Sequence, residues 1–149
     1  MPIGEFCNRE VVVIERGATA LDAAQLMRMH HVGSVVVVDT LEGARKPVGV
    51  LTDRDIVVEL VAKQVAPDSV KVGDMISGRV ATIGDSTGVY DTLHFMREHG
   101  FRRMPVIDQG GELVGIVTMD DYLALFAEEL SEVAKLIARE HHMEMKLHP

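Results

Sequence analysis

The chain has 149 residues, of which 47% are hydrophobic and 26% charged, enough apolar material for one ordinary domain or two very small ones. Its 15 Lys and Arg against 23 Asp and Glu give a net charge of −8, which disfavours nucleic acid and anionic membranes as partners. The single cysteine, Cys7, excludes an internal disulfide, and the apolar runs are too short to span a bilayer. The first residues do not resemble a secretion signal, so we expect a cytoplasmic protein.

The first half of the chain predicts the order β-α-β-β-α. Residues 11–14 form a short β-prone run. Apolar side chains then recur at helical spacing up to Met27, and Thr19 with Asp22 resembles a capping box that opens this helix. Residues 35–38 and 48–51 predict a second and a third strand, separated by a polar loop over 40–46. A second helix is expected to begin near Thr52.

The second half predicts the same order after a connector at residues 67–76, which contains one helical turn at 72–76. Strands are expected at 80–83, 104–107 and 114–117, with a helix after the first of them and a loop at 109–112. The closing helix is predicted over about residues 120–140. Its apolar side chains form one stripe: Leu123, Phe126, Leu130, Val133, Leu136 and Ile137. We expect this stripe to pack against a partner subunit.

The two halves are related by an internal duplication. Residues 11–39 align with 80–108 without a gap, and 47–57 align with 113–123 after a loop that is three residues shorter. Twelve of the 40 aligned positions are identical. We therefore predict a first repeat at 1–66, a connector at 67–76, a second repeat at 77–127 and a helical extension at 128–149. Since neither repeat can bury its own sheet, the predicted fold is a mixed α/β (α+β) structure with two β-α-β-β-α units packed sheet to sheet.

A Gly-apolar-apolar-Thr-x-x-Asp string ends the third strand of each repeat, with Thr52 and Asp55 in the first and Thr118 and Asp121 in the second. One interpretation is a capping box that satisfies free N–H groups at a helix start. The other is a nucleoside site, in which the helix start and the threonine hydroxyl face a phosphate while the carboxylate accepts from both hydroxyls of a ribose. Recurrence in both halves favours the nucleoside site, and the two interpretations are compatible.

These strings, together with residues 100–108 before the second of them, resemble a tandem pair of CBS domains, the Bateman module named after cystathionine β-synthase. The resemblance extends from about residue 7 to residue 126. The first half matches less closely, because residues 32–39 lack the basic residue and the proline found more often in the family.

The resemblance implies a regulatory sensor with pseudo-twofold symmetry and no catalytic activity, cofactor or metal. Such modules bind adenosine-containing ligands in clefts between the repeats; AMP is the first expectation, with ATP, ADP, NAD and S-adenosylmethionine as alternatives. A homodimer and a regulated protein partner are also implied. The family pattern assigns ribose contacts to Asp55 and Asp121 and phosphate contacts to Thr52 and Thr118. The remaining expected ligand-binding residues are Arg54, Arg102, Arg103, Val11, Val12, Val80, Ala81, Met104 and Pro105.

The two predicted clefts differ in charge. Arg102 and Arg103 align with Gly33 and Ser34, and Arg54 aligns with Asp120. We therefore expect the two clefts to bind nucleotide with unequal affinities. The sequence does not decide which of them binds more tightly. The alternative function is a ligand-free interaction or dimerisation adaptor, in which the Thr and Asp residues only cap helices.

Overall fold

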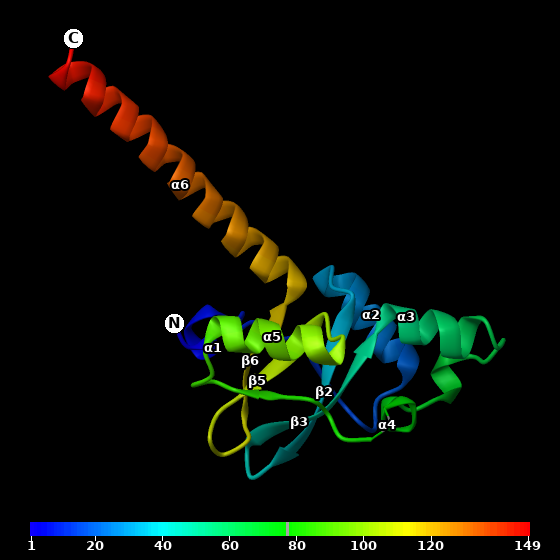
Figure 1. Ribbon diagram of the computed structural model, residues 1–149. Helices are drawn as coiled ribbons and strands as arrows, with labels where there is room; N and C mark the ends of the chain where they lie inside the picture. Colours follow the sequence, from blue (N-terminus) through cyan, green and yellow to red (C-terminus); the bar gives the residue numbers. More distant parts are fainter. Residues whose placement is uncertain (77) are drawn as a thin grey trace. The chain divides into compact units, whose positions relative to one another are not determined.

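The structure is a computed structural model that describes residues 1–76 and 78–149; Ser77, where the predicted second repeat begins, lies outside the described residues. The chain divides into two compact units, Met1–Val117 and Thr118–Pro149, which are described separately. The elements are α1 (Ile3–Phe6), β1 (Val13–Glu15), α2 (Ala20–His30), β2 (Ser34–Leu41), β3 (Ala44–Thr52), α3 (Asp53–Ile56), the π-helix η1 (Val57–Val61), the 3₁₀ turn η2 (Pro67–Ser69), α4 (Val72–Met75), β4 (Ile83–Gly84), α5 (Val89–His99), β5 (Arg103–Ile107), β6 (Leu113–Thr118) and α6 (Met119–Leu147) (Figure 1).

The first sheet has the order β1-β2-β3, with β1 parallel and β3 antiparallel to β2. The loop predicted at 40–46 is wrong, because β2 runs to Leu41 and β3 begins at Ala44. Only Glu42 and Gly43 make the turn, with φ of 52° and 82°. Two consecutive positive φ angles match the right-handed twist of a hairpin, so the strands pair up to the turn itself.

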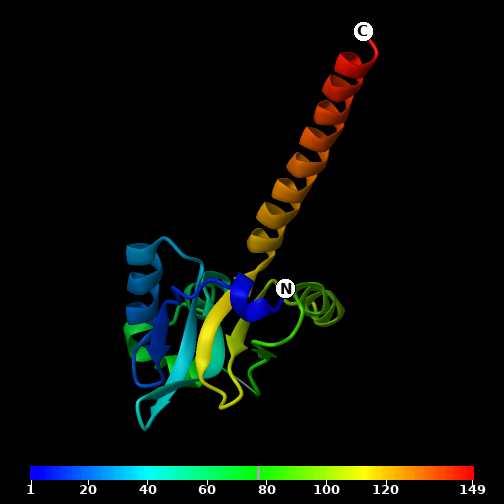
Figure 2. The same cartoon turned by 90° about the vertical axis from the view of Figure 1, so that its left-hand side faces the viewer.

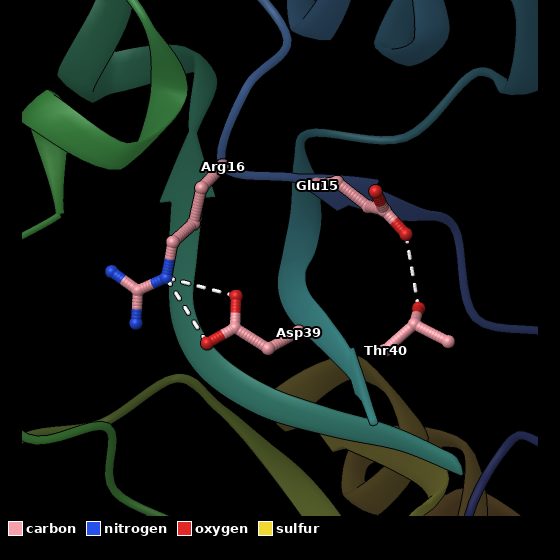
Figure 3. Close-up of polar contacts among 4 residues, drawn as sticks. All are labelled: Glu15, Arg16, Asp39 and Thr40. Carbon is pink, nitrogen blue, oxygen red and sulfur yellow. Dashed lines mark hydrogen bonds and ion pairs between the residues drawn. The ribbon is translucent and has the colours of Figure 1, made fainter. Parts of the chain in front are cut away.

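The end of β1 is tied to β2 by polar contacts across the parallel pair (Figure 3). Nε of Arg16 donates to both carboxylate oxygens of Asp39, at 2.9 and 3.2 Å. The hydroxyl of Thr40 donates to Oε1 of Glu15 at 2.9 Å. Since these groups are exposed, we expect them to contribute little stability and mainly to orient the short strand.

The second sheet repeats this plan with the order β4-β5-β6, and β4 runs parallel to β5. The predicted loop at 109–112 lies between β5 and β6, as expected. The first strand of each repeat begins later than predicted, at Val13 and at Ile83. The residues before these strands are β-prone but mostly lack a ladder partner, so local propensity placed their starts too early.

The two sheets face each other between α2 on one side and α5 on the other (Figure 2). The continuous apolar run of β2 is explained by burial on both of its faces. Val35 and Val37 belong to the core that includes α2, while Val36 and Val38 pack with Leu113 of the second sheet. The predicted sheet-to-sheet packing is therefore confirmed.

The short helices α1 and α4 are exchanged between the repeats. The amides of Ile3 and Gly4 donate to the carbonyls of Thr87 and Asp85, so α1 lies against the second repeat. The amides of Val72 and Gly73 donate to the carbonyls of Ala18 and Arg16, so α4 lies against the first. The alignment offset of 69 residues therefore continues upstream through Ile3/Val72 and Gly4/Gly73, and residues 70–75 are the counterpart of residues 1–6.

The second unit is dominated by α6, a single helix of 29 residues. It continues to Leu147, beyond the predicted end near residue 140, because residues 141–147 contain no glycine or proline to stop it. The stripe residues Leu123, Leu130, Val133, Leu136 and Ile137 are 54–69% exposed. Within the described ranges, no helix is both long and apolar enough to cross a bilayer.

Candidate functional site

Both Thr-x-x-Asp strings form complete capping boxes. The amide of Thr52 donates to Oδ2 of Asp55 at 2.9 Å, and the amide of Asp55 donates to the Thr52 hydroxyl oxygen at 3.1 Å. Thr118 and Asp121 make the same two contacts, at 2.8 and 3.3 Å. Thr19 and Asp22 form a third box at the start of α2, as predicted. The capping interpretation is thus confirmed. A ligand at one of these boxes would have to bind through atoms that the capping hydrogen bonds do not use.

A cavity of about 550 Å³ opens beside the first of these boxes. The end of β3 and the start of α3 form one wall, and the segment that enters β4 together with the start of β5 forms the other. The cavity is lined by Val48, Gly49, Val50, Thr52, Asp53, Arg54, Asp55, Met75, Ile76, Arg79, Val80, Ala81, Gly100, Phe101, Arg102, Arg103 and Pro105. The first compact unit therefore brings both repeats to a single concave site.

Asp55 presents one unused carboxylate oxygen beside this cavity. Its Oδ2 is engaged by the Thr52 amide, while Oδ1 has no hydrogen-bond partner among the described residues. Asp55 as a whole is half-buried. An ionised carboxylate oxygen accepts hydrogen bonds only, which suits hydroxyl or N–H donors.

Four arginines line the same cavity: Arg54, Arg79, Arg102 and Arg103. The ion pairs of the described residues are Arg16–Asp39, Lys63–Glu59 and Lys135–Glu132, so none of the four is neutralised by a carboxylate partner. The carboxylates of the lining are those of Asp53 and Asp55. This part of a chain with a net charge of −8 is consequently cationic and suited to an anion.

Arg103 and Asp53 meet the backbone of the first repeat at the same carbonyl. The Arg103 guanidinium donates to the carbonyl oxygen of Gly33 at 3.4 Å, and the Asp53 amide donates to it at 3.0 Å. A Cβ at Gly33 would lie 3.3 Å from Oδ2 of Asp53, so a glycine keeps this corner uncrowded. The contact holds one arginine of the second repeat against the start of α3.

Gly49, the glycine that precedes the first box, makes room for a neighbouring side chain. A Cβ added to Gly49 would lie 2.8 Å from Cγ2 and 2.9 Å from Cβ of Ile76. The close approach at Gly49 is therefore made by the Ile76 side chain, which itself lines the cavity. Gly115 in the second repeat meets Cys7 in the equivalent way, with a Cβ position 2.6 Å from Sγ.

Helix α3 spans four residues and continues without a break into the π-helix η1 at Val57. The helix start and the arginines therefore both contribute positive character beside the cavity.

Eight of the predicted ligand-binding residues line this cavity: Thr52, Arg54, Asp55, Val80, Ala81, Arg102, Arg103 and Pro105. Met104 does not, because its side chain is fully buried and faces away from its neighbours 103 and 105 on β5. Val11 packs with Val13 against the inter-sheet core, and neither it nor Val12 is part of this lining. Thr118 and Asp121 belong to the second compact unit.

Arg79 and Ile76 are the lining residues that sequence reasoning missed. Both lie between α4 and β4. Ile76 is the last residue of the predicted connector at 67–76, and Arg79 directly precedes the strand predicted at 80–83. The repeat alignment carried a signal for Arg79, because its counterpart is Glu10. The counterparts of Arg54, Arg102 and Arg103 are Asp120, Gly33 and Ser34. Each of the four cavity arginines is therefore aligned with a residue that is not basic in the other repeat.

Comparison with known proteins identifies the two repeats. Residues 3–62 and 72–128 each match the CBS domain. An uncharacterized protein of Methanopyrus kandleri is 37% identical over 121 residues, which are 81% of this chain and 60% of that protein's length. A CBS domain protein from Pyrobaculum aerophilum, solved as a complex with AMP, superposes with a TM-score of 0.72 at 26% identity, covering 81% of this chain and 89% of that one. A hexameric CBS-CP12 protein from bloom-forming cyanobacteria gives 0.72 at 28% identity, over 94% and 85% of the chains.

Proposed function

Because the chain belongs to the CBS-domain family, we propose that it is a regulatory module that binds an adenosine-containing nucleotide in the cavity beside Thr52 and Asp55. The observation that carries this proposal is the cluster of four arginines around a cavity of about 550 Å³, none of which has a carboxylate partner among the described residues. That volume is within the usual range of about 300–1,000 Å³ for small-molecule sites. AMP is the first candidate, supported by the AMP complex of the Pyrobaculum aerophilum protein.

The proposed roles follow from the chemistry of the lining. The free Oδ1 of Asp55 accepts from the ribose hydroxyls while Oδ2 keeps its bond to the Thr52 amide. The arginines contact the phosphate, where charge-assisted hydrogen bonds are the strongest available. The apolar side chains of Ile76, Val80 and Pro105 supply a surface for the flat adenine ring.

A ligand in this cavity would link regulation to the packing of the repeats. The lining comes from β3 and α3 of the first repeat and from β5 of the second, so one bound molecule contacts both. Binding therefore favours the arrangement of the two repeats in which the distance between these walls matches the width of the ligand. A protein that recognises this arrangement would receive the nucleotide signal.

A second candidate function is a ligand-free adaptor, and the capping boxes favour it. All three boxes are complete without a ligand, and the residues of two of them, at Thr19 and Thr118, are not part of the cavity lining. The Thr-x-x-Asp pattern is thus explained by helix capping alone. The arginine cluster is the feature that the adaptor leaves unexplained.

Thermal unfolding with a panel of AMP, ADP, ATP, NAD and S-adenosylmethionine separates the two functions. A ligand that binds only the native state at 100 times its Kd adds about 2.7 kcal/mol to the free energy of unfolding, which raises the midpoint. GMP and inorganic phosphate are the controls for base recognition and for anion binding alone. A midpoint unchanged by every adenosine compound would refute the nucleotide site and leave the adaptor.

A further inference from the structure

Helix α6 carries a heptad pattern of apolar residues that are exposed. Leu123, Phe126, Leu130, Val133 and Ile137 alternate at spacings of three and four, as in the a and d positions of a coiled coil. All except the half-buried Phe126 are more than half exposed. Glu140 and Glu144 occupy the next two positions of the pattern, so the apolar seam ends at Ile137.

Such a helix needs a partner for its seam. Helices in water gain most of their stability from packing an amphipathic face, and isolated ones are marginal. At 1.5 Å per residue the 29 residues of α6 extend for about 43 Å. A seam of regular heptads on a straight helix is complementary to another copy of itself, which makes a second copy of this chain the simplest occupant.

Charge is distributed unevenly along α6 and selects the orientation of that second copy. Residues 119–132 contain five acidic residues and no lysine or arginine, whereas residues 133–147 contain Lys135, Arg139 and Lys146 against two glutamates. A parallel pair would place the two acidic halves side by side, at an interaxial distance of about 8–10 Å, within the Debye length of about 10 Å at 0.1 M salt. An antiparallel pair places each acidic half beside a basic one.

We propose that α6 pairs antiparallel with α6 of a second copy through the seam Leu123–Phe126–Leu130–Val133–Ile137, making the chain a dimer. The seam residues contact one another near its midpoint at Leu130. The acidic first half of each helix lies along the basic second half of the other. This pairing is independent of nucleotide binding.

The seam is tested by a matched pair of variants examined by size-exclusion chromatography with light scattering. Leu130→Gln removes a seam side chain from both helices, and Ser131→Gln makes the same polar substitution one residue away, outside the seam. Loss of a buried leucine from each of two chains is expected to weaken association about a hundredfold or more, while Ser131→Gln leaves it unchanged. A parent chain that is monomeric at about 100 µM, or a dimer that Leu130→Gln does not weaken, would overturn the proposal.

The orientation is tested by pulsed electron paramagnetic resonance on spin-labelled cysteine variants. Met145 lies 15 residues from the seam midpoint, so labels on Met145→Cys are about 45 Å apart along an antiparallel pair. In a parallel pair they lie at the same height, below about 25 Å. Ser131→Cys, near the midpoint, gives a short distance in either orientation and reports that the pair has formed. The parent chain, whose Cys7 is buried, controls for background labelling. A short Met145 distance would refute the antiparallel arrangement.

Discussion

Replacement of Asp55 by asparagine separates the capping role of this residue from its proposed ribose contact. The structure gives its two oxygens different environments, with Oδ2 bound to the Thr52 amide and Oδ1 without a hydrogen-bond partner among the described residues, while Asp55 itself lines the cavity. Asparagine keeps the shape and one acceptor oxygen, but it removes the charge and replaces one oxygen with an amide donor. A hydrogen bond to a charged group contributes about 1.5–3 kcal/mol. We therefore expect Asp55→Asn to weaken AMP binding about 10- to 150-fold, measured by isothermal titration calorimetry.

Asp22 provides the matched control for this substitution. It occupies the same position of the same capping box, with an amide-to-Oδ2 distance of 2.9 Å, but it is not part of the cavity lining. Asp22→Asn and Asp55→Asn should lower the free energy of unfolding by similar amounts, up to about 1 kcal/mol each. Only Asp55→Asn should change the affinity for AMP.

The ribose contact is isolated further by the ligand. Deoxyadenosine monophosphate lacks the 2′-hydroxyl, so part of the contribution of Asp55 should already be absent from its binding. The affinity loss caused by Asp55→Asn should therefore be smaller for the deoxy ligand than for AMP, giving a measurable coupling energy. Equal losses for the two ligands, or equal AMP affinities of the Asp22 and Asp55 variants, would refute the assignment of Oδ1 to the ribose.

Three further changes test the cavity and the packing around it. Arg102→Gln should weaken ATP binding about tenfold in calorimetry, because one charge-assisted contact is lost, whereas Arg97→Gln on α5, outside the lining, should not. Gly49→Ala should lower the free energy of unfolding in urea by about 1–3 kcal/mol through overpacking against the neighbouring side chain, while Gly17→Ala, with open space around it, should be neutral or stabilising. Deletion of residues 1–8 should remove hydrogen-exchange protection at the start of α5 and in β6, whose amides donate to that segment, and leave β2 protected. Unchanged ATP affinity, unchanged stability or unchanged protection would contradict the respective argument.

The fold could be predicted from the sequence wherever local pattern and tertiary packing agree. The apolar run of β2, the two aligned helices and the Thr-x-x-Asp helix starts follow directly from periodicity and capping chemistry. The predictions failed where long-range contacts decide the outcome. The hairpin at Glu42 and Gly43 is tighter than its polar composition suggested, because pairing with the opposite strand extends the ladder to the turn.

The sequence predicted eight residues of the cavity lining, together with others that the structure does not place in it. Strand alternation alone could have excluded Met104, since Arg103 and Pro105 share one face of β5 and Met104 the other. Arg79 could not be found from a motif, because it lies outside the described helices and strands. The predicted boundaries between repeats, connector and extension stay predictions, and so do the compartment and the regulated partner.

The exchange of α1 and α4 explains why residues between α4 and β4, such as Ile76 and Arg79, line the cavity. The chain leaves the first repeat, returns to it at α4, and only then enters β4 of the second repeat. Met75 and Ile76 at one end of this passage, and Arg79, Val80 and Ala81 at the other, all line the cavity. The covalent link between the repeats is therefore itself a wall of the proposed nucleotide site. A ligand held by Arg79 on this wall and by Arg54 on α3 would resist any motion that separates α4 from the second sheet. Regulation through the proposed site would therefore need no conformational signal to travel between distant regions, because the ligand would contact the segment that joins the repeats.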